Sequence, residues 1–195
     1  MELDDGNVKM KIEPAKKIKG LFMITAEPHN DDRGYMRRLF DDALMEKAGL
    51  KMHCVQVSHS YVKKKYTVKG FHVALPPELE GKTVTVVRGK VMWVCIDVRK
   101  DSESFGQWES FELSGELNNS LYAPPGIAHG SITLTDDCQL VLRADNYFHQ
   151  GTGIVWNDPD LNIDWPEKDP KKVIIRERDT KYPTFKEFKE KYGGV

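Results

Sequence analysis

The sequence predicts an all-β fold, a sandwich or barrel of short strands with a few short helices at its periphery. Many short segments are rich in Val, Ile, Thr and aromatic residues, and turn residues separate them. Arg88-Gly89-Lys90 is a tight hairpin signal between two of the strongest of these segments. Since the 195 residues contain no repeat and no long linker, we expect a single domain over residues 1–195.

Eight segments have the composition of strands. In chain order they are Leu21 to Thr25, Met52 to Val62, Lys82 to Arg88, Lys90 to Val98, Gln107 to Leu113, Ser120 to Ala123, Ser131 to Leu134 and Gln139 to Ala144. Between the last of them and the C-terminal region, residues 150–172 carry several Pro, Asp and Asn residues. We expect this segment to be a long ordered loop over the edge of a sheet.

Two segments have convincing helix signals. Asp41 can cap a short helix that ends at Gly49. Thr184 and Glu187 form a capping box for a final helix at about 184–192. Three aromatic residues of this second helix share one face, which we expect to dock on the body of the domain: Phe185, Phe188 and Tyr192.

The composition excludes several classes of protein. Lys and Arg number 29 against 30 Asp and Glu, for a net charge of -1, and a nucleic-acid binder would usually show a basic excess. No apolar run approaches the length of a membrane span, and the acidic start lacks the apolar core of a signal peptide. Three scattered cysteines fit neither a disulfide framework nor a zinc site, so we expect a cytoplasmic location.

Two residue types stand out as candidates for chemistry. Lys82 shares a strand face with Val84 and Val86, where a cation is costly unless it meets an anion or lines a cavity, although a lysine at a strand start can also reach solvent. A lone histidine such as His72 is more often structural than catalytic. The turn from Pro124 to His129 is more specific, because a Pro-x-Gly-x-x-His turn entering a strand resembles the second half of the cupin motif pair.

Cupins that bind a metal carry a His-x-His and a Glu in the first half of that pair. In this chain the corresponding region supplies only His72, beside Val73 and Ala74. Because three or four ligands in one cluster are lacking, we expect no metal.

A longer series of motifs, from about Gly20 to Pro183, resembles the dTDP-4-dehydrorhamnose 3,5-epimerase family of nucleotide-sugar epimerases. The matching pieces are Asp32-Arg33-Gly34, Gln56-Val57-Ser58-His59-Ser60, Lys69-Gly70-Phe71-His72, Gly81-Lys82, Val98-Arg99, Phe105-Gly106-Gln107-Trp108, Pro125-Gly126-Ile127-Ala128-His129-Gly130, Asn146-Tyr147, Trp156-Asn157-Asp158-Pro159, Ile163-Asp164-Trp165-Pro166 and Glu177-Arg178-Asp179. Their order along nearly the whole chain carries the resemblance.

The resemblance implies a cupin jelly roll, usually a homodimer, that works without metal or organic cofactor on nucleoside-diphosphate 4-keto-6-deoxy sugars. His72 matches the catalytic base, Asp179 the carboxylate that orients it, and Lys82 the cation that holds the enolate oxygen. The physical logic agrees, since a developing enolate needs stabilisation and a histidine has an ordinary pKa near ~6.5. Eight residues match or replace substrate-binding positions: Arg33, Arg38, Gln56, Ser58, Lys69, His129, Phe148 and Arg178.

The chain departs from the family at its proton donor. The tyrosine expected thirteen residues after His129 is Leu142, which cannot donate a proton. One alternative is that water or another group donates the proton, and Tyr61, Tyr66 and Cys54 are near in sequence. Alternatively the enzyme acts at one carbon only, performs a related isomerisation, or has a degenerate site.

Three binding positions also differ, because the family has an arginine at Lys69, a glutamate at Arg38 and an asparagine at Ser58. They suggest another base or a different sugar, such as a heptose.

The sequence therefore predicts an epimerase that acts at C3, C5 or both on a nucleoside-diphosphate 4-keto sugar, in the biosynthesis of deoxy sugars or heptoses for surface polysaccharide. The alternatives are a nucleotide-sugar-binding cupin without turnover, suggested by Leu142, and a related keto-sugar isomerase. A metal-dependent cupin oxygenase is disfavoured because its ligand set is absent.

Overall fold

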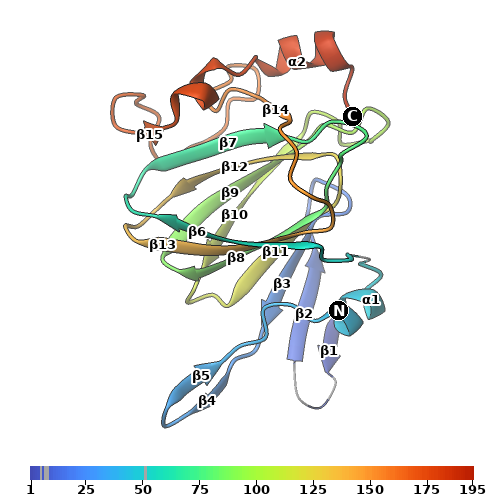
Figure 1. Cartoon of the computed structure of the whole chain (residues 1–195), viewed down its shortest axis with the longest axis vertical. Helices are drawn as coiled ribbons and strands as arrows, with labels where there is room; N and C mark the ends of the chain where they lie inside the picture. Colours follow the sequence, from blue (N-terminus) through green and yellow to red (C-terminus); the bar gives the residue numbers. More distant parts are fainter. Residues whose placement is uncertain (5, 7–8, 51) are drawn as a thin grey trace.

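Two antiparallel sheets face each other in the computed structural model, which describes residues 1–4, 6, 9–50 and 52–195 (Figure 1). Within these residues the larger sheet has seven strands, in the order β1 (Glu2–Asp4), β2 (Lys9–Pro14), β3 (Phe22–Ala26), β11 (Asn119–Ala123), β8 (Lys82–Arg88), β13 (Cys138–Ala144) and β6 (Gln56–Val62).

The smaller sheet has the order β10 (Trp108–Ser114), β9 (Lys90–Asp97), β12 (Ile127–Thr133), β7 (Thr67–Val73) and β14 (Thr152–Gly153). The short strand β15 (Ile174–Ile175) adds to β7 in parallel. A separate hairpin, β4 (His29–Asp31) with β5 (Gly34–Met36), projects from the body of the molecule (Figure 1). The prediction of an all-β fold with short peripheral helices is confirmed.

All eight predicted strands are present, with β8 at its predicted bounds. The bounds of two other strands differ from the prediction by several residues. Residues 52–55 precede β6 rather than belong to it, and β12 begins at Ile127, before the predicted Ser131. Seven strands lacked a clear sequence signal: β1, β2, β4, β5, β7, β14 and β15. For β7 the reason is a bulge against β12, which breaks the alternation of polar and apolar residues on which strand prediction relies.

The two faces of β9 contribute side chains to two different hydrophobic cores. Val91, Trp93 and Cys95 face the interior between the two sheets, where they pack with residues such as Val84 and Leu121. The opposite face of β9 carries Val94 and Ile96. With Val98, directly after the strand, they belong to a second core on the outer side of the smaller sheet. A third, smaller cluster packs helix α1 (Asp42–Lys47) against the N-terminal strands.

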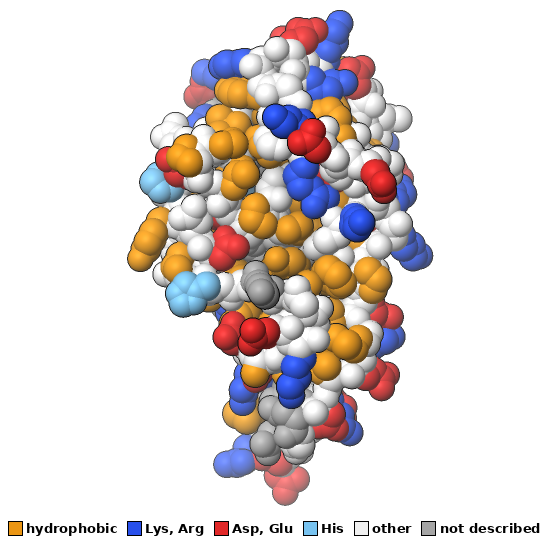
Figure 2. All heavy atoms as spheres, turned by 90° about the vertical axis from the view of Figure 1, so that its right-hand side faces the viewer, with side chains coloured by type: hydrophobic (Ala, Val, Ile, Leu, Met, Phe, Trp, Pro, Cys, Tyr) orange, Lys and Arg blue, Asp and Glu red, His pale blue; other side chains and the backbone are white. Residues whose placement is uncertain are grey.

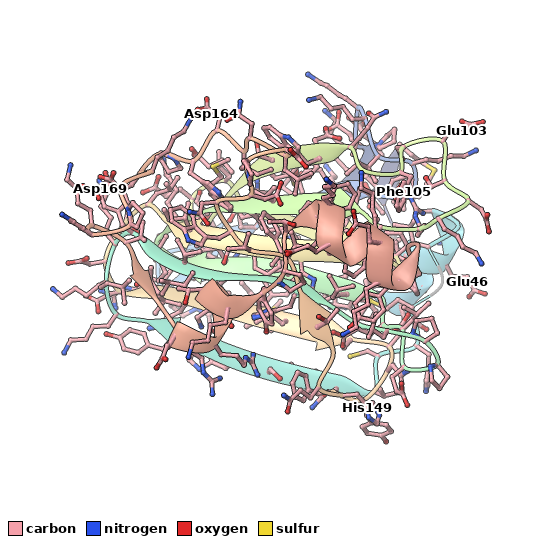
Figure 3. All side chains as sticks on the ribbon, turned by 90° about the horizontal axis from the view of Figure 1, so that it is seen from above. Glu46, Glu103, Phe105, His149, Asp164 and Asp169 are labelled. Atoms are coloured by element: carbon pink, nitrogen blue, oxygen red, sulfur yellow. The ribbon has the colours of Figure 1, made fainter. Side chains whose placement is uncertain are left out.

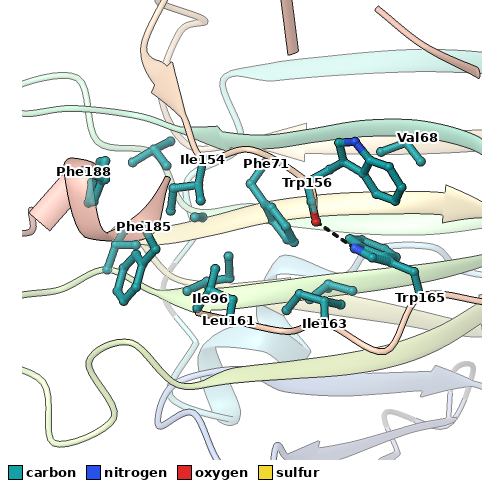
Figure 4. Close-up of a cluster of buried hydrophobic side chains, with 14 of the residues drawn as sticks. Val68, Phe71, Ile96, Ile154, Trp156, Leu161, Ile163, Trp165, Phe185 and Phe188 are labelled. Atoms are coloured by element: carbon teal, nitrogen blue, oxygen red, sulfur yellow. Dashed lines mark hydrogen bonds between the residues drawn. The ribbon is translucent and has the colours of Figure 1, made fainter. Parts of the chain in front are cut away.

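The second core is covered by the C-terminal third of the chain (Figure 4). Trp165 from the long connection 154–173 packs against Phe71 and Trp156, and its indole donates a hydrogen bond to the carbonyl of Trp156 at 2.8 Å. Residues 150–172 are thus mostly loop, as predicted, but they cover a sheet face as well as its edge. Viewed from above, this region and α2 lie across the strands (Figure 3).

Both predicted helices form with the predicted caps. The side chain of Asp41 accepts from the backbone of Leu44 at the start of α1. Thr184 and Glu187 make the reciprocal capping box of α2 (Phe185–Tyr192). Phe185 and Phe188 are buried in the second core, so the aromatic face docks on the domain as expected. A short 3₁₀ helix, η1 (Glu177–Lys181), precedes α2 and lies beside β7.

Charged side chains of both signs are interspersed with apolar ones on the face shown in Figure 2, with no large basic area. Cys95 and Cys138 are buried and Cys54 is half-buried, and all three are free thiols. Neither α1 nor α2, nor any other helix of the described residues, is long and apolar enough to cross a bilayer.

Candidate functional site

A cavity of about 180 Å³ lies between the two sheets. One wall comes from β7, β12 and β9 of the smaller sheet, which contribute Lys69, His72 and His129. The facing wall comes from β6, β8 and β13 of the larger sheet. Lys82 and Leu142 are on that wall. Two predicted catalytic residues, His72 and Lys82, therefore approach the same space from opposite sheets.

The bulge in β7 explains why Lys69 and His72 both face the cavity. His72 pairs with His129 and Lys69 with Ser131, so β7 carries one extra residue between the two pairs. In a regular strand, residues three apart point to opposite faces, and the extra residue restores the same face. Gly70 makes this possible, because its φ is +97° and a Cβ there would lie 2.5 Å from the carbonyl oxygen of His129.

Asp179 lies beside His72, as predicted. Its Oδ2 is 3.3 Å from His72 Nε2 and accepts a hydrogen bond from the backbone of Gly70 at 3.4 Å. The His72–Asp179 contact is too bent for a regular hydrogen bond, which is common in catalytic pairs without substrate. The parallel pairing of β15 with β7 brings η1, and with it Asp179, to this position. Nδ1 is then the ring nitrogen left for a substrate.

Burial lowers the pKa of His72, while the charge of Asp179 opposes this effect. The pKa of His129 is lowered further, well below its ordinary value, by burial and by the neighbouring Lys82. The ring of His129 stacks on Trp93 at 5.5 Å between centroids. Both imidazoles are therefore neutral at pH 7, which is the state that a general base requires.

Lys82 makes two polar contacts at the entrance of the cavity. Its Nζ donates to Glu80 Oε1 at 2.5 Å and lies 3.4 Å from His129 Nε2. The Lys82 and Glu80 side chains are both largely buried. A cation held beside a neutral histidine, in a space of low polarity, can stabilise a negative oxygen that develops next to it. The periodicity of β8 left two positions open for the Lys82 side chain, in solvent or in a cavity, and the structure places it at the cavity.

Four predicted binding residues surround the mouth of the cavity. Gln56 and Phe148 are adjacent, because the Phe148 backbone donates to Gln56 Oε1 at 3.0 Å. Together with Ser58 they line an outer pocket that also reaches Lys82 and Leu142. Arg178 lines a neighbouring pocket with His72. Phe148 is 69% exposed, so its ring is available to stack on a ligand. His149 is exposed and points away from the sheets (Figure 3).

The structure does not bring Arg33 and Arg38 into the cavity. Arg33 is at the turn of the β4–β5 hairpin, where it pairs with Asp31, and its side chain is 90% exposed. Arg38 follows β5 and pairs with Asp41 at the cap of α1. Within the described chain, both arginines lie apart from the residues that face the cavity.

None of the three sequence neighbours considered as substitute acids lines the described cavity. Tyr61 lies on the outer face of β6 and donates to Asp137. Tyr66 packs against the second core, and Cys54 precedes β6. His59 is exposed on the outer face as well.

Leu142 is on the cavity wall opposite His72, as its alignment with the family tyrosine implies. Sequence reasoning missed two polar residues of the site, Glu80 and Ser60. Glu80 is two residues before Lys82, and Ser60 is two residues after Ser58. Two-residue spacing in an extended chain places side chains on one face, so this periodicity could have identified both.

The assembled groups can perform proton chemistry next to a carbonyl. A neutral imidazole with a buried carboxylate behind it can accept a proton, and Lys82 faces it across the cavity. Among the described residues, no group of three His, Cys, Asp or Glu side chains is arranged to hold a metal ion.

Comparison with known proteins gives a consistent answer. The sequence model described as dTDP-4-dehydrorhamnose 3,5-epimerase matches residues 15–187. A curated protein of that name from Methanothermobacter thermautotrophicus is 33% identical over 172 residues, which is 87% of this chain and 92% of that protein. Another from Shigella flexneri is 35% identical over 157 residues, 79% of this chain and 86% of that protein.

Solved structures agree. The Bacillus anthracis dTDP-4-dehydrorhamnose 3,5-epimerase with TDP and PPi bound has a TM-score of 0.85 at 29% identity, covering 90% of this chain and 99% of that one. A Legionella pneumophila epimerase in complex with dTDP-4-keto-L-rhamnose has a TM-score of 0.83 at 30% identity, covering 90% of this chain and 92% of that one. The predicted cupin-type jelly roll is confirmed by this likeness.

Proposed function

Because the chain belongs to the dTDP-4-dehydrorhamnose 3,5-epimerase family and is an isomerase of the carbohydrate-epimerase class, we propose that it epimerises a nucleoside-diphosphate 4-keto sugar at C3, C5 or both. The observation that carries the proposal is the convergence of His72, Asp179 and Lys82 on one cavity between the sheets. The product would serve in the biosynthesis of deoxy sugars or heptoses for surface polysaccharide.

In this proposal His72 removes a proton from the carbon next to the C4 ketone. Asp179 orients the ring and stabilises the imidazolium that forms. Lys82 turns from Glu80 toward the ketone oxygen and stabilises the enolate charge. Since charge develops on both His72 and the ketone oxygen in the transition state, the buried carboxylate and the ammonium both stabilise that state more than the bound substrate.

The nucleotide is expected at the mouth. Phe148 can stack on the base, while Gln56, Ser58 and Arg178 surround it with hydrogen-bonding groups. The Bacillus anthracis neighbour binds TDP and the Legionella pneumophila neighbour binds a dTDP-linked keto sugar, so dTDP sugars are the first to test. Binding by Lys69 and His129, which line the inner cavity, remains a prediction.

We also propose a homodimer, in which the β4–β5 hairpin of one subunit extends toward the site of the other. The hairpin projects from the body, and Tyr35 and Met36 on it are 60% and 68% exposed (Figure 1). Such apolar residues on a projecting ribbon favour a covered position. This arrangement would give Arg33 a substrate-binding role that it lacks in the single chain. A monomeric mass by light scattering at micromolar concentration would contradict it.

The test of the epimerase is solvent deuterium uptake. The protein is incubated in D₂O with dTDP-, GDP- and CDP-linked 4-keto-6-deoxy sugars, and C3 and C5 are followed by NMR. We expect exchange at one or both carbons in the wild type and a loss of about 10²–10⁴-fold in His72→Ala, since a general base is removed. Unchanged exchange in His72→Ala would refute the proposal.

Leu142 favours one alternative, a nucleotide-sugar-binding protein without turnover, because the wall facing His72 has lost the family's acid. Tight binding of a nucleotide sugar with no exchange at either carbon would establish this alternative. The same measurement therefore separates the two candidates.

A further inference from the structure

The cavity wall opposite His72 carries a hydroxyl near the position of Leu142. Ser60 of β6 pairs with Leu140 of β13, and Ser58 pairs with Leu142. Since alternate residues of a strand share a face, Ser58, Ser60, Leu140 and Leu142 all belong to one face of the larger sheet. Diagonal neighbours across paired strands are roughly 7–8 Å apart. Ser60 lines the inner cavity with Leu142, whereas Ser58 lines the outer pocket.

Ser60 is held by a cation from the other sheet. Lys69 Nζ donates a hydrogen bond to Ser60 Oγ at 2.8 Å, which connects β7 to β6 across the side of the cavity. Because the Ser60 oxygen accepts in this bond, its hydroxyl hydrogen is free to point elsewhere. Lys69 is also exposed, so its ammonium can exchange protons with solvent.

Resting on the proposed function, we propose that Ser60 and Lys69 supply the proton that the family's tyrosine would give. After His72 has removed the proton, the enolate reforms the C4 ketone, and its electron pair forms a C–H bond with the Ser60 proton. The Ser60 O–H bond breaks, and the oxygen takes a proton from Lys69 Nζ. Water then reprotonates Lys69, and His72 releases its proton to solvent. Protons and charges balance over the cycle.

Two further features support this role. His72 lines the cavity from the smaller sheet and Ser60 from the larger, so a sugar bound between them would lose its proton on one face and regain it on the other, as inversion requires. Lys69 is exposed at the edge of the cavity, but partial burial of its ammonium still lowers its pKa from the ordinary value, which makes it a better acid near neutral pH.

The test separates inversion from exchange. In D₂O with a dTDP-linked 4-keto-6-deoxy sugar, the wild type should invert the reacting carbon with incorporation of deuterium. Ser60→Ala should lose inversion by about 10²–10⁴-fold, while His72 still exchanges the proton on its own face. Exchange without inversion is therefore the expected signature. In Lys69→Met the ratio of inversion to exchange should fall by the same factor, whatever the change in substrate binding, which covers the case that Ser60→Ala folds poorly.

Ser131→Ala is the matched control, because it removes a hydroxyl that lines the same cavity from the wall of His72. It should invert like the wild type. A Leu142→Tyr change added to Ser60→Ala should restore inversion. Wild-type inversion in Ser60→Ala and Lys69→Met, or equal loss of exchange and inversion in both, would overturn the inference. Absence of exchange in the wild type itself would instead refute the epimerase proposal.

Discussion

Replacing Asp179 by asparagine tests the pairing of a buried carboxylate with the proposed base. The change keeps the size of the side chain, which is only 4% exposed, and leaves an oxygen for the Gly70 backbone. At the 3.3 Å separation from His72, Coulomb's law with an effective dielectric constant of about 20 gives about 5 kcal/mol for full charges.

The His72 side chain is 39% exposed, so solvent screens part of this attraction. If about half survives, the imidazolium that forms in the transition state loses ~2–3 kcal/mol, which corresponds to about 10²-fold in kcat. The pH profile should move as well. Because Asp179 raises the pKa of His72 against the effect of burial, its removal lowers that pKa further, and the acid limb of kcat/KM shifts to lower pH.

The assay is the initial rate of deuterium exchange as a function of pH, measured for the wild type and Asp179→Asn. Glu177→Gln is the matched control, since Glu177 is on the same 3₁₀ helix but pairs with Lys181 at the surface. Its rate and acid limb should equal those of the wild type. If Asp179→Asn exchanged as fast as the wild type, with the same acid limb, the carboxylate would not act through His72.

Three other changes have defined outcomes. Lys82→Met should lower the rate of deuterium exchange by about 10²–10³-fold with little change in nucleotide binding, because it removes the donor to the enolate oxygen. Lys90→Met is the control: Lys90 pairs with Glu112 at the surface, so its exchange rate should equal that of the wild type. Phe185→Ala should lower the free energy of unfolding in urea by about 3–5 kcal/mol because it empties a buried site, whereas the exposed Phe148→Ala should not change it. Because the pKa values of His129 and His72 are lowered in the folded protein, the unfolded chain binds protons more readily, so the contribution of these histidines to stability is full above about pH 6.5 and is lost as the pH falls toward their folded pKa values. His129→Gln should therefore reduce the drop in melting temperature between pH 7 and pH 5. An equal drop in both proteins would contradict the lowered pKa of His129.

Strands β8 and β9 could be predicted from the sequence, because both are rich in β-branched and aromatic residues and a tight hairpin signal joins them. Both faces of β9 are buried, so its sequence is apolar almost throughout rather than alternating. The caps of α1 and α2 could also be predicted from the sequence, because capping depends on side chains within a few residues of the helix end.

Strand β7 could not be predicted in this way, because its bulge places Lys69 and His72 on the same face. A bulge depends on the partner strand as much as on the bulged one. The contacts of Lys82 with Glu80 and of Lys69 with Ser60 are likewise set by folding, since a sequence does not show which groups face one another across a cavity. The position of Arg33 outside the cavity has the same origin.

The attachment of β15 and η1 to β7 has a consequence for how activity is acquired during synthesis. The Gly70–Asp179 contact spans 109 positions of the chain, and β15 and Asp179 follow all the residues that line the cavity in chain order. A nascent chain that has just passed Leu142 therefore holds every cavity-lining residue and still lacks the carboxylate behind its base. Turnover would thus report that residues 174–179 have been made and have docked on β7.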